Sequence, residues 1–477
     1  MDPQPAAARP APSPGAPPVA PNEPTSALVR GMGLPQATAA NMLNMIGIGP
    51  FITLGTILGY MGGPQAMLGW LLGAVLSMCD GLVYAELGAA LPGAGGAFVY
   101  FREAFNPASW GLLFSFLFLW EMLFSGPLGM AAACVGFGDY AQYLAPRMGH
   151  VGVTLLAMGV AAVITLLLYR PIASVGKLSM WLLAVVLAAI GWVIVAGVLH
   201  MSVHQAFAFP PGAFRFDGSF FVGLSSATLF ALYNYGGYNN VTYLGGEVRE
   251  PGKNIPRAIV VSILVVAALY LMMSICVVGV VPWHQAVSSN AVISDFIGRI
   301  YGRGAADVMT GLILVATFGG VFALSLGYSR ILFAAGEAGQ FFRVFGRVHR
   351  TGRFPTVSLL AINGAALVLC WLPVEQLIQA QMIVQIVFQF IPQVLAVYAI
   401  RRYRKQIARP FRMWLYPLPA LLALLGWIYV ASSPGQLRYL GVTAVLAVAG
   451  IAAYGLWAWR RRQWPLAARR DPTARAQ

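Results

Sequence analysis

Stretches of mostly apolar residues follow one another along almost the whole chain. Each has the roughly 17 to 25 residues that a helix needs to cross a bilayer, and about twelve can be counted. Lipid cannot satisfy free backbone polar groups, so helices are the expected conformation. The pattern predicts an all-α membrane protein with about 12 transmembrane helices, beginning near Ala37, Ala66, Ala108, Val151, Gly176, Phe220, Ala258, Ala305, Thr356, Leu377, Met413 and Leu440.

Two of these stretches, the first and the sixth, are interrupted by glycine, proline and asparagine. The first contains Gly47-Ile48-Gly49-Pro50-Phe51 and the sixth contains Tyr233-Asn234-Tyr235-Gly236-Gly237-Tyr238-Asn239. A helix broken inside a bilayer leaves amides and carbonyls that persist only against protein or a ligand-filled cavity. A ligand is therefore expected at the two breaks. The alternative is that these glycines only let neighbouring helices approach closely.

The two breaks also suggest an internal repeat, because each opens a block of five predicted helices. An odd number of helices inverts the second copy, and inverted repeats bind substrate between their broken helices near the bilayer midplane. Half-helix N-termini suit a carboxylate and free carbonyls suit an amine, as in an amino acid zwitterion. The predicted organisation is a disordered Pro/Ala-rich tail over 1–32, repeats over 33–200 and 218–402, two further helices over 410–459, and a basic tail over 460–477.

The composition agrees with a membrane protein: 59% of the residues are hydrophobic, 9% are charged, and the mean hydropathy is +0.73. The net charge of +15 does not require nucleic acid. With the N-terminus inside, about 25 of the basic residues fall on the inward side, as the positive-inside rule expects. Both termini are therefore predicted to be cytoplasmic, with the chain in the cytoplasmic membrane. The basic clusters lie at 343–353, 401–412 and 460–475.

Three carboxylates fall within apolar stretches, where an ionised group is costly and is a functional candidate. Glu121 has no basic residue in its stretch, so it is a candidate for binding and releasing a proton or for holding a cation. The alternative is a structural, protonated side chain. For Asp80, pairing within the helix bundle and a coupling role both stay open. Glu86, near the inward end, is expected to cap or bridge a loop.

Other polar residues carry weaker signals. Gln381, Gln385, Gln389 and Gln393 recur every four residues, so they lie near one helix face and either bond neighbouring helices or line a wet pathway. Thr317 has no second hydroxyl residue next to it, which argues weakly against a sodium site. Protons are therefore the expected coupling ion, and uncoupled exchange is the alternative. No metal site is expected, because His200 and His204 have no cysteines nearby.

Alternatives to transport have little support in the sequence. The histidines are scattered, and neither Gly-x-Ser-x-Gly nor His-Glu-x-x-His is present, so no enzyme and no cofactor is expected. No ion-selectivity filter or ring of charge indicates a channel. Four cysteines, all in apolar stretches at unrelated spacings, are expected to be packing residues rather than disulfide or zinc ligands: Cys79, Cys134, Cys276 and Cys370.

Several motifs in order resemble the amino acid, polyamine and organocation transporter superfamily, from about Gly33 to Trp459. They are the first break, Ala85-Glu86-Leu87-Gly88 followed by Gly95-Gly96, the segment from Gly246 to Ala258, Ser329-Arg330, and Arg409-Pro410-Phe411-Arg412. The resemblance implies ten core helices in two inverted repeats plus two peripheral helices. It also implies backbone contacts to substrate at Gly47, Ile48 and Gly49, and an aromatic gate at Tyr233.

The expected substrate-binding residues are Ile46, Gly47, Ile48, Gly49, Pro50, Tyr233, Asn234, Gly236, Gly237 and Tyr238, with Glu121 and Asp80 for proton coupling or cation binding. Two departures matter. Amino acid members often have a small hydroxyl residue at Ile48, and Pro50 removes one amide from the half-helix N-terminus. Polyamine uptake transporters share the Gly-x-Gly-Pro-Phe pattern and an acid at Asp80, so polyamines are the runner-up to amino acids. With no outward cysteine, no disulfide-linked partner subunit is expected.

Overall fold

The computed structural model of the chain describes residues 30–47, 49–93, 95–169, 175–348, 355–461 and 464–465. Within these residues the only regular secondary structure is helical, apart from isolated bridges between Met32 and Val248 and between Val348 and Pro355. This confirms the predicted all-α fold. Most of the predicted disordered tail, most of the basic C-terminal tail, and Ile48 lie outside the described residues.

In the described part of the chain, eight helical segments are long and apolar enough to cross a membrane. A ninth span is formed by α1 (Leu34–Met45) and α2 (Gly49–Met61), which are bent by 51° at the first break. The eight are η1 with α3 (Pro64–Ala90), α5 (Trp110–Ala141), α6 (His150–Leu168), α7 (Val175–His200), α11 (Pro251–Val278), α14 (Arg303–Glu337), α16 to α17 (Val374–Tyr403) and η4 with α19 (Pro434–Arg461).

Shorter helices occupy the three remaining predicted stretches: α9 (Gly218–Tyr235), α15 (Thr356–Leu369) and α18 (Leu418–Ala431). A helix or bent pair therefore lies at every predicted stretch. The connecting elements are α4 (Ala97–Ala104), α8 (Val203–Ala206), α10 (Asn240–Tyr243), α12 (Trp283–Ser288), α13 (Val292–Tyr301) and η2 (Arg343–Gly346). The segment from α16 (Val374–Gln385) to α17 (Ile391–Tyr403) passes through a π-helical turn, η3 (Ile386–Phe390).

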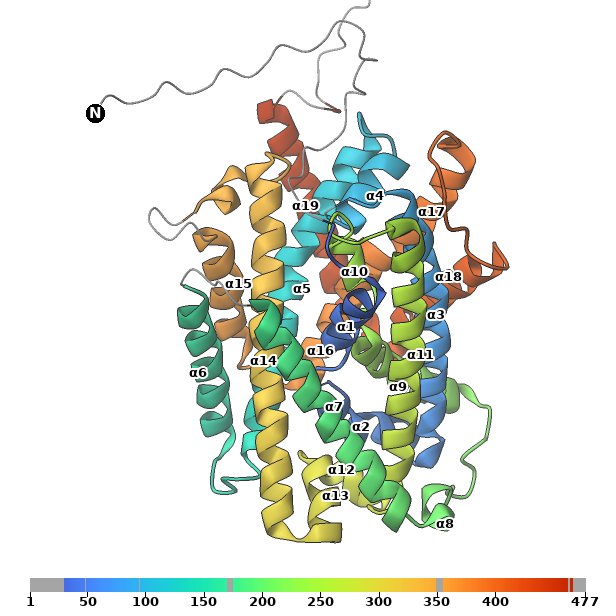
Figure 1. Cartoon of the computed structure of the whole chain (residues 1–477), viewed down its shortest axis with the longest axis vertical. Helices are drawn as coiled ribbons and strands as arrows, with labels where there is room; N and C mark the ends of the chain where they lie inside the picture. The colour runs from blue at the N-terminus through green and yellow to red at the C-terminus, as the bar shows by residue number, and fades with distance from the viewer. Residues whose placement is uncertain are drawn as a thin grey trace, which may run out of the picture.

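The helices pack in two groups (Figure 1). In the first helix group α3 packs against α9 and α11, α2 against α9, and α1 and α10 against each other and against α11. In the second helix group α5 packs against α6, α14, α15 and α16. Figure 1 shows α1 and α2 in the middle of the molecule. The broken first span therefore lies at the centre of the molecule.

Small residues allow close packing between α3 and α9. A Cβ atom added to Gly69 would lie 2.8 Å from the Ala227 Cβ, and one added to Gly73 would lie 2.8 Å from the Ala231 Cβ. Both glycines and both alanines are spaced four residues apart, which places each pair on one helix face. This is the small-residue contact that brings membrane helices together without a hydrophobic driving force.

The predicted bridging role of Glu86 is confirmed. Its carboxylate accepts two hydrogen bonds from the Arg401 guanidinium, at 2.7 Å and 2.5 Å, and a third from the Met413 amide at 2.8 Å. The guanidinium also stacks on the Tyr416 ring, 3.7 Å from its centre. Glu86 thereby ties α3 to α17 and to the segment before α18.

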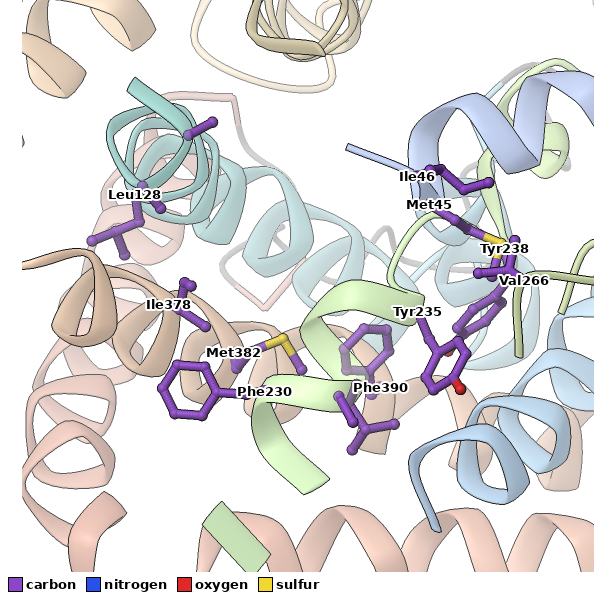
Figure 2. Close-up of a cluster of buried hydrophobic side chains, with 14 of the residues drawn as sticks. Met45, Ile46, Leu128, Phe230, Tyr235, Tyr238, Val266, Ile378, Met382 and Phe390 are labelled. Carbon is purple, nitrogen blue, oxygen red and sulfur yellow. The ribbon is translucent and has the colours of Figure 1, made fainter. Parts of the chain in front are cut away.

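All four cysteines are free and buried, as expected of packing residues. The hydrophobic core also surrounds the end of α1. Figure 2 shows Met45 and Ile46 beside Tyr238 and Val266, with the Tyr235 ring next to them. Ile46, an expected substrate residue, has only 1% of its side chain exposed. Its side chain belongs to the core, so only its backbone is left to face a ligand.

Candidate substrate site at the helix breaks

The first break leaves backbone groups that neighbouring side chains only partly satisfy. Tyr270 of α11 donates its hydroxyl to the Met45 carbonyl at 2.9 Å, and the Gly47 amide donates to the same carbonyl at 3.1 Å. On the far side Gly49, Pro50 and Phe51 form the first turn of α2. The amides of a first helical turn have no partner within the helix, and proline contributes none. The amides of Gly49 and Phe51 therefore have no partner within α2.

Open space lies beside Gly47, because a Cβ atom added to it would meet nothing within 4 Å. Gly49 has no such space, since an added Cβ would collide with the Asn234 amide oxygen and approach the Tyr233 ring to 3.3 Å. At the first break, Gly47 thus borders free space, whereas Gly49 packs closely against α9. Ile48 between them lies outside the described residues.

The second break begins where α9 ends at Tyr235. Gly236 is not helical, and Gly237 has a φ of +112°, a conformation that side chains other than glycine rarely adopt. A Cβ atom on Gly237 would also lie 2.9 Å from the Asn44 carbonyl carbon of α1. Gly237 therefore allows the second break to approach α1 closely, which is the alternative role that the sequence analysis gave to these glycines.

The two breaks are tied to each other on both sides. Asn41 of α1 accepts a hydrogen bond from the Val241 amide at 2.8 Å, and Asn240 donates to the Ala40 carbonyl at 3.2 Å. On the other side Asn234 of α9 donates to the Thr53 hydroxyl of α2 at 2.7 Å. The structure therefore brings together the two breaks that the sequence placed about 190 residues apart.

Asn234 has an unused acceptor at the centre of this arrangement. Its NH2 group donates to Thr53 and to the Phe230 carbonyl, both at 2.7 Å. Its side-chain oxygen has no hydrogen-bond partner among the residues that the structure describes, although Asn234 is 2% exposed. A buried polar atom without a partner costs about 1–3 kcal/mol, so a ligand donor there would be stabilising. That oxygen is a suitable acceptor for an ammonium group beside Gly49.

The two other aromatic residues expected at the site differ in their surroundings. Tyr233 is partly exposed. Its ring approaches Gly49 at the first break. Tyr238 is buried and donates its hydroxyl to Asp80 at 2.7 Å. Tyr233 is thus placed to cover a ligand at the break, whereas the Tyr238 hydroxyl holds a carboxylate.

Asp80 is fully buried and surrounded by donors. Trp427 of α18 donates to one carboxylate oxygen at 3.1 Å and Tyr238 donates to the other at 2.7 Å. The Gln393 side chain also interacts with this carboxyl group. A carboxylate with donors on both oxygens is stabilised in its ionised form without a cation. The arrangement suits an anchor between α3, α18 and the second break.

Glu121 has the opposite environment. It is fully buried in α5, and neither carboxyl oxygen has a hydrogen-bond partner among the described residues. The Ser125 hydroxyl, one turn further along, lies beside it outside hydrogen-bonding geometry. Because nothing fixes a negative charge there, the site favours a neutral carboxylic acid.

Several residues of this site carry no signal in the sequence. Tyr270 and Tyr140 are ordinary aromatic positions in apolar stretches, and only the fold shows that their hydroxyls reach the backbone of the first break. Tyr140, for example, donates to the Phe51 carbonyl of α2 at 2.9 Å. Thr53 likewise could not be identified from the sequence, because a single hydroxyl residue in an apolar stretch is common.

This site can be compared with known proteins. A profile of the amino acid permease family matches residues 32–454, which includes both breaks, Asp80 and Glu121. The chain belongs to the amino acid permease family. That membership confirms the resemblance drawn from the motifs, and with the apolar helices it makes this permease a multi-span membrane transporter.

Individual relatives are also named for amino acids. The serine/threonine exchanger SteT of Bacillus subtilis (strain 168) is 25% identical over 436 residues, which cover 90% of this permease and 96% of the relative. The Asc-type amino acid transporter 1 of Homo sapiens is 27% identical over 445 residues, covering 91% and 84%. The cationic amino acid transporter 4 of Mus musculus is 29% identical over 360 residues, covering 70% and 54%.

Proposed function

We propose that this permease carries amino acids across the cytoplasmic membrane by alternating access, with substrate bound between the two helix breaks. The observation that carries the proposal is the pairing of the breaks, which leaves the Asn234 side-chain oxygen without a partner beside the N-terminus of α2. Membership of the amino acid permease family and the names of the relatives support the substrate class.

The two charges of an amino acid match the groups at the breaks. The free amides of Gly49 and Phe51, at the positive end of α2, would bind the carboxylate. The Asn234 side-chain oxygen and the backbone carbonyls of Ile46 and Gly47 would accept hydrogen bonds from the amine. A polyamine has no carboxylate to place at the helix N-terminus, and the relatives named above transport amino acids, so polyamines are not favoured.

The wider organisation supports the same mechanism. The bent pair α1 and α2 opens the proposed repeat over 33–200, and the broken α9 and α10 open the proposed repeat over 218–402. The Glu86–Arg401 pair lies at the end of α3 that we place at the cytoplasmic side, near the basic loop that follows α17. Both termini would then be cytoplasmic.

We further propose that transport is coupled to protons through Glu121. A buried carboxyl group without fixed donors can be neutral when protonated and costly when ionised, so its charge state depends on the surrounding conformation. Asp80, with donors on both oxygens, is better suited to remain ionised. Glu121 is therefore preferred over Asp80 as the group that takes up and releases the proton.

The decisive experiment is uptake by purified permease in proteoliposomes. Labelled neutral, cationic and anionic amino acids are offered alongside putrescine and spermidine, with and without an inward proton gradient. Amino acid uptake that increases with the gradient is expected. Uptake of polyamines alone would contradict the proposed substrate class, and gradient-independent exchange of amino acids would contradict proton coupling while retaining the substrate class.

Tyr233→Ala is expected to raise the apparent KM about tenfold or more and to change thermal stability little. The ring covers the break and buries ligand area at small rotamer cost, so its loss removes binding contacts while leaving the helix intact. Tyr398→Ala is the matched control, because Tyr398 is 52% exposed on α17. An unchanged KM would remove Tyr233 from the substrate site.

A further inference from the structure

A small cavity opens between the C-terminal ends of α14 and α19. Figure 1 shows both helices ending at the same end of the molecule. The cavity has a volume of about 190 Å³, and two of its lining residues belong to the segment that follows α14 while four belong to the end of α19. They are Phe342, Arg343, Leu456, Trp457, Arg460 and Arg461. Two segments distant in the sequence therefore build one cavity.

The walls of this cavity are fixed by contacts on both sides. Phe116 of α5, which is buried, contacts the rings of Phe342 and Trp457, with both ring centres 5.6 Å from its own. Arg461 donates to the Gly339 carbonyl in the turn after α14, and its guanidinium lies over the Trp457 ring at 5.1 Å. Aromatic packing and a hydrogen bond between the two segments thus hold the cavity in shape.

The cavity is strongly cationic. Three guanidinium groups line it, and no acidic side chain of the described residues does. Arg343 and Arg460 are exposed, and the described part of the chain gives neither an ion pair nor a hydrogen bond. Arg461 uses one donor on Gly339, and a guanidinium has five. Guanidinium groups match the geometry of phosphate oxygens, so a phosphate group fits this charge.

The surface beside the cavity is apolar and faces outward. The span that ends in α19 is the most exposed in the described structure, with only 17% of its apolar window buried. Val445, Val448 and Leu456 share one face of α19, and each is more than half exposed. Leu456 belongs both to this face and to the cavity wall. A ligand with a phosphate group and a hydrocarbon chain therefore fits both surfaces at once.

We propose that this cavity binds the phosphate group of an anionic phospholipid, with an acyl chain lying along α19. Arg343 would hold the phosphate from the segment after α14, and Arg460 would hold it from α19. The lipid would then bridge the two segments and hold the last span against the end of α14. With the termini placed in the cytoplasm, it belongs to the cytoplasmic leaflet, where basic pockets between spans bind anionic headgroups. This site is separate from the substrate site at the breaks.

Arginines at the inward ends of spans also serve to orient a chain in the membrane. That role needs charge but no cavity, and it is filled equally well by Arg402 and Arg412, which are exposed and lie outside the cavity. Replacing these two by glutamine removes the same charge as replacing Arg343 and Arg460. The pair Arg402→Gln with Arg412→Gln is therefore the matched control for a lipid site built by the cavity.

The test is native mass spectrometry of the purified permease titrated with phosphatidylglycerol or phosphatidylcholine. Wild type should bind a first phosphatidylglycerol more tightly than phosphatidylcholine, whose headgroup carries a cation that the arginines repel. Arg343→Gln and Arg460→Gln should each weaken that binding about fivefold, and the two together about 25-fold. The control pair should bind as wild type does. Without lipid, the thermal midpoint should be unchanged in all variants, because these arginines have no partner to lose.

A second arm identifies the source of the phosphate. Phosphatidylglycerol should raise the thermal midpoint of wild type, as a ligand of the folded state does, whereas glycerol 1-phosphate and inorganic phosphate at the same concentration should not. Stabilisation by the soluble phosphates as strong as that by the lipid would overturn the lipid as occupant. Equal phosphatidylglycerol affinity in the cavity pair and the control pair would overturn the cavity as the site. None of these readouts depends on transport, so the proposed function is tested separately.

Discussion

Glu121→Gln is expected to abolish the accumulation of amino acid driven by a pH gradient while leaving counterflow exchange within about twofold of wild type. Glutamine has the shape and polarity of the protonated acid, so the variant resembles a permease that never releases its proton. Exchange moves substrate in both directions without deprotonation. Net uptake needs the carrier to return empty, which in the proposed cycle requires the carboxyl group to release its proton and then bind another.

The measurement compares the accumulation ratio of a labelled substrate with and without an inward proton gradient, in the same vesicles used for counterflow. Glu250→Gln is a suitable control, because Glu250 is 68% exposed and paired only with the exposed Lys253. It should transport as wild type does. Loss of both accumulation and exchange in Glu121→Gln would assign Glu121 a structural or binding role instead.

Glu86→Ala should produce the largest loss of stability among the substitutions considered. It leaves the Arg401 guanidinium, 17% exposed, without the carboxylate that accepts its two hydrogen bonds, and it removes the acceptor for the Met413 amide. Breaking a buried pair from one side costs about 3–5 kcal/mol. We expect a strong decrease in the thermal midpoint of the purified permease and in the yield of folded protein.

Lys253→Ala provides the contrast for this measurement, since its ion pair with Glu250 is exposed and such pairs contribute about 0–1 kcal/mol. Arg401→Lys tests the geometry rather than the charge: it retains the positive charge but loses the two-pronged contact and the stacking on Tyr416. For Arg401→Lys we expect a thermal midpoint between those of the wild type and Glu86→Ala. If Glu86→Ala melts at the wild-type temperature, the pair is not a significant source of stability.

The sequence predicted the helices and their breaks because both depend on local composition. Apolar stretches of sufficient length, and the glycines and proline that interrupt them, need no knowledge of neighbours. Glu121, Asp80 and Glu86 could be found for the same reason, since a carboxylate stands out in an apolar stretch. Their different environments could not be predicted. Donors reach Asp80 from the second break and from α18, and only the packing shows that Glu121 has none fixed to it among the described residues.

Gln389 shows where sequence periodicity stops being informative. The four-residue spacing of the glutamines indicated one helix face, but the π-helical turn changes the rotation per residue between Gln385 and Gln393 from that of a regular α-helix. Gln389 consequently bonds to tyrosines of α3 and α10, while Gln393 lies against Asp80. The expected helix-to-helix bonding occurs at Gln389, through contacts that depend on the turn.

The span containing this turn is attached at its two ends to different parts of the molecule. Its α16 end packs on α5, whereas its α17 end packs on α3 and is held there by Arg401 and Glu86. In the proposed alternating-access cycle the two helix groups move relative to each other, and a helix attached to both must bend or twist between the attachments. The π-helical turn, whose backbone bonds are already displaced from the regular pattern, is the softest place along it. The permease would then flex at Ile386–Phe390 each time it exchanges one open side for the other.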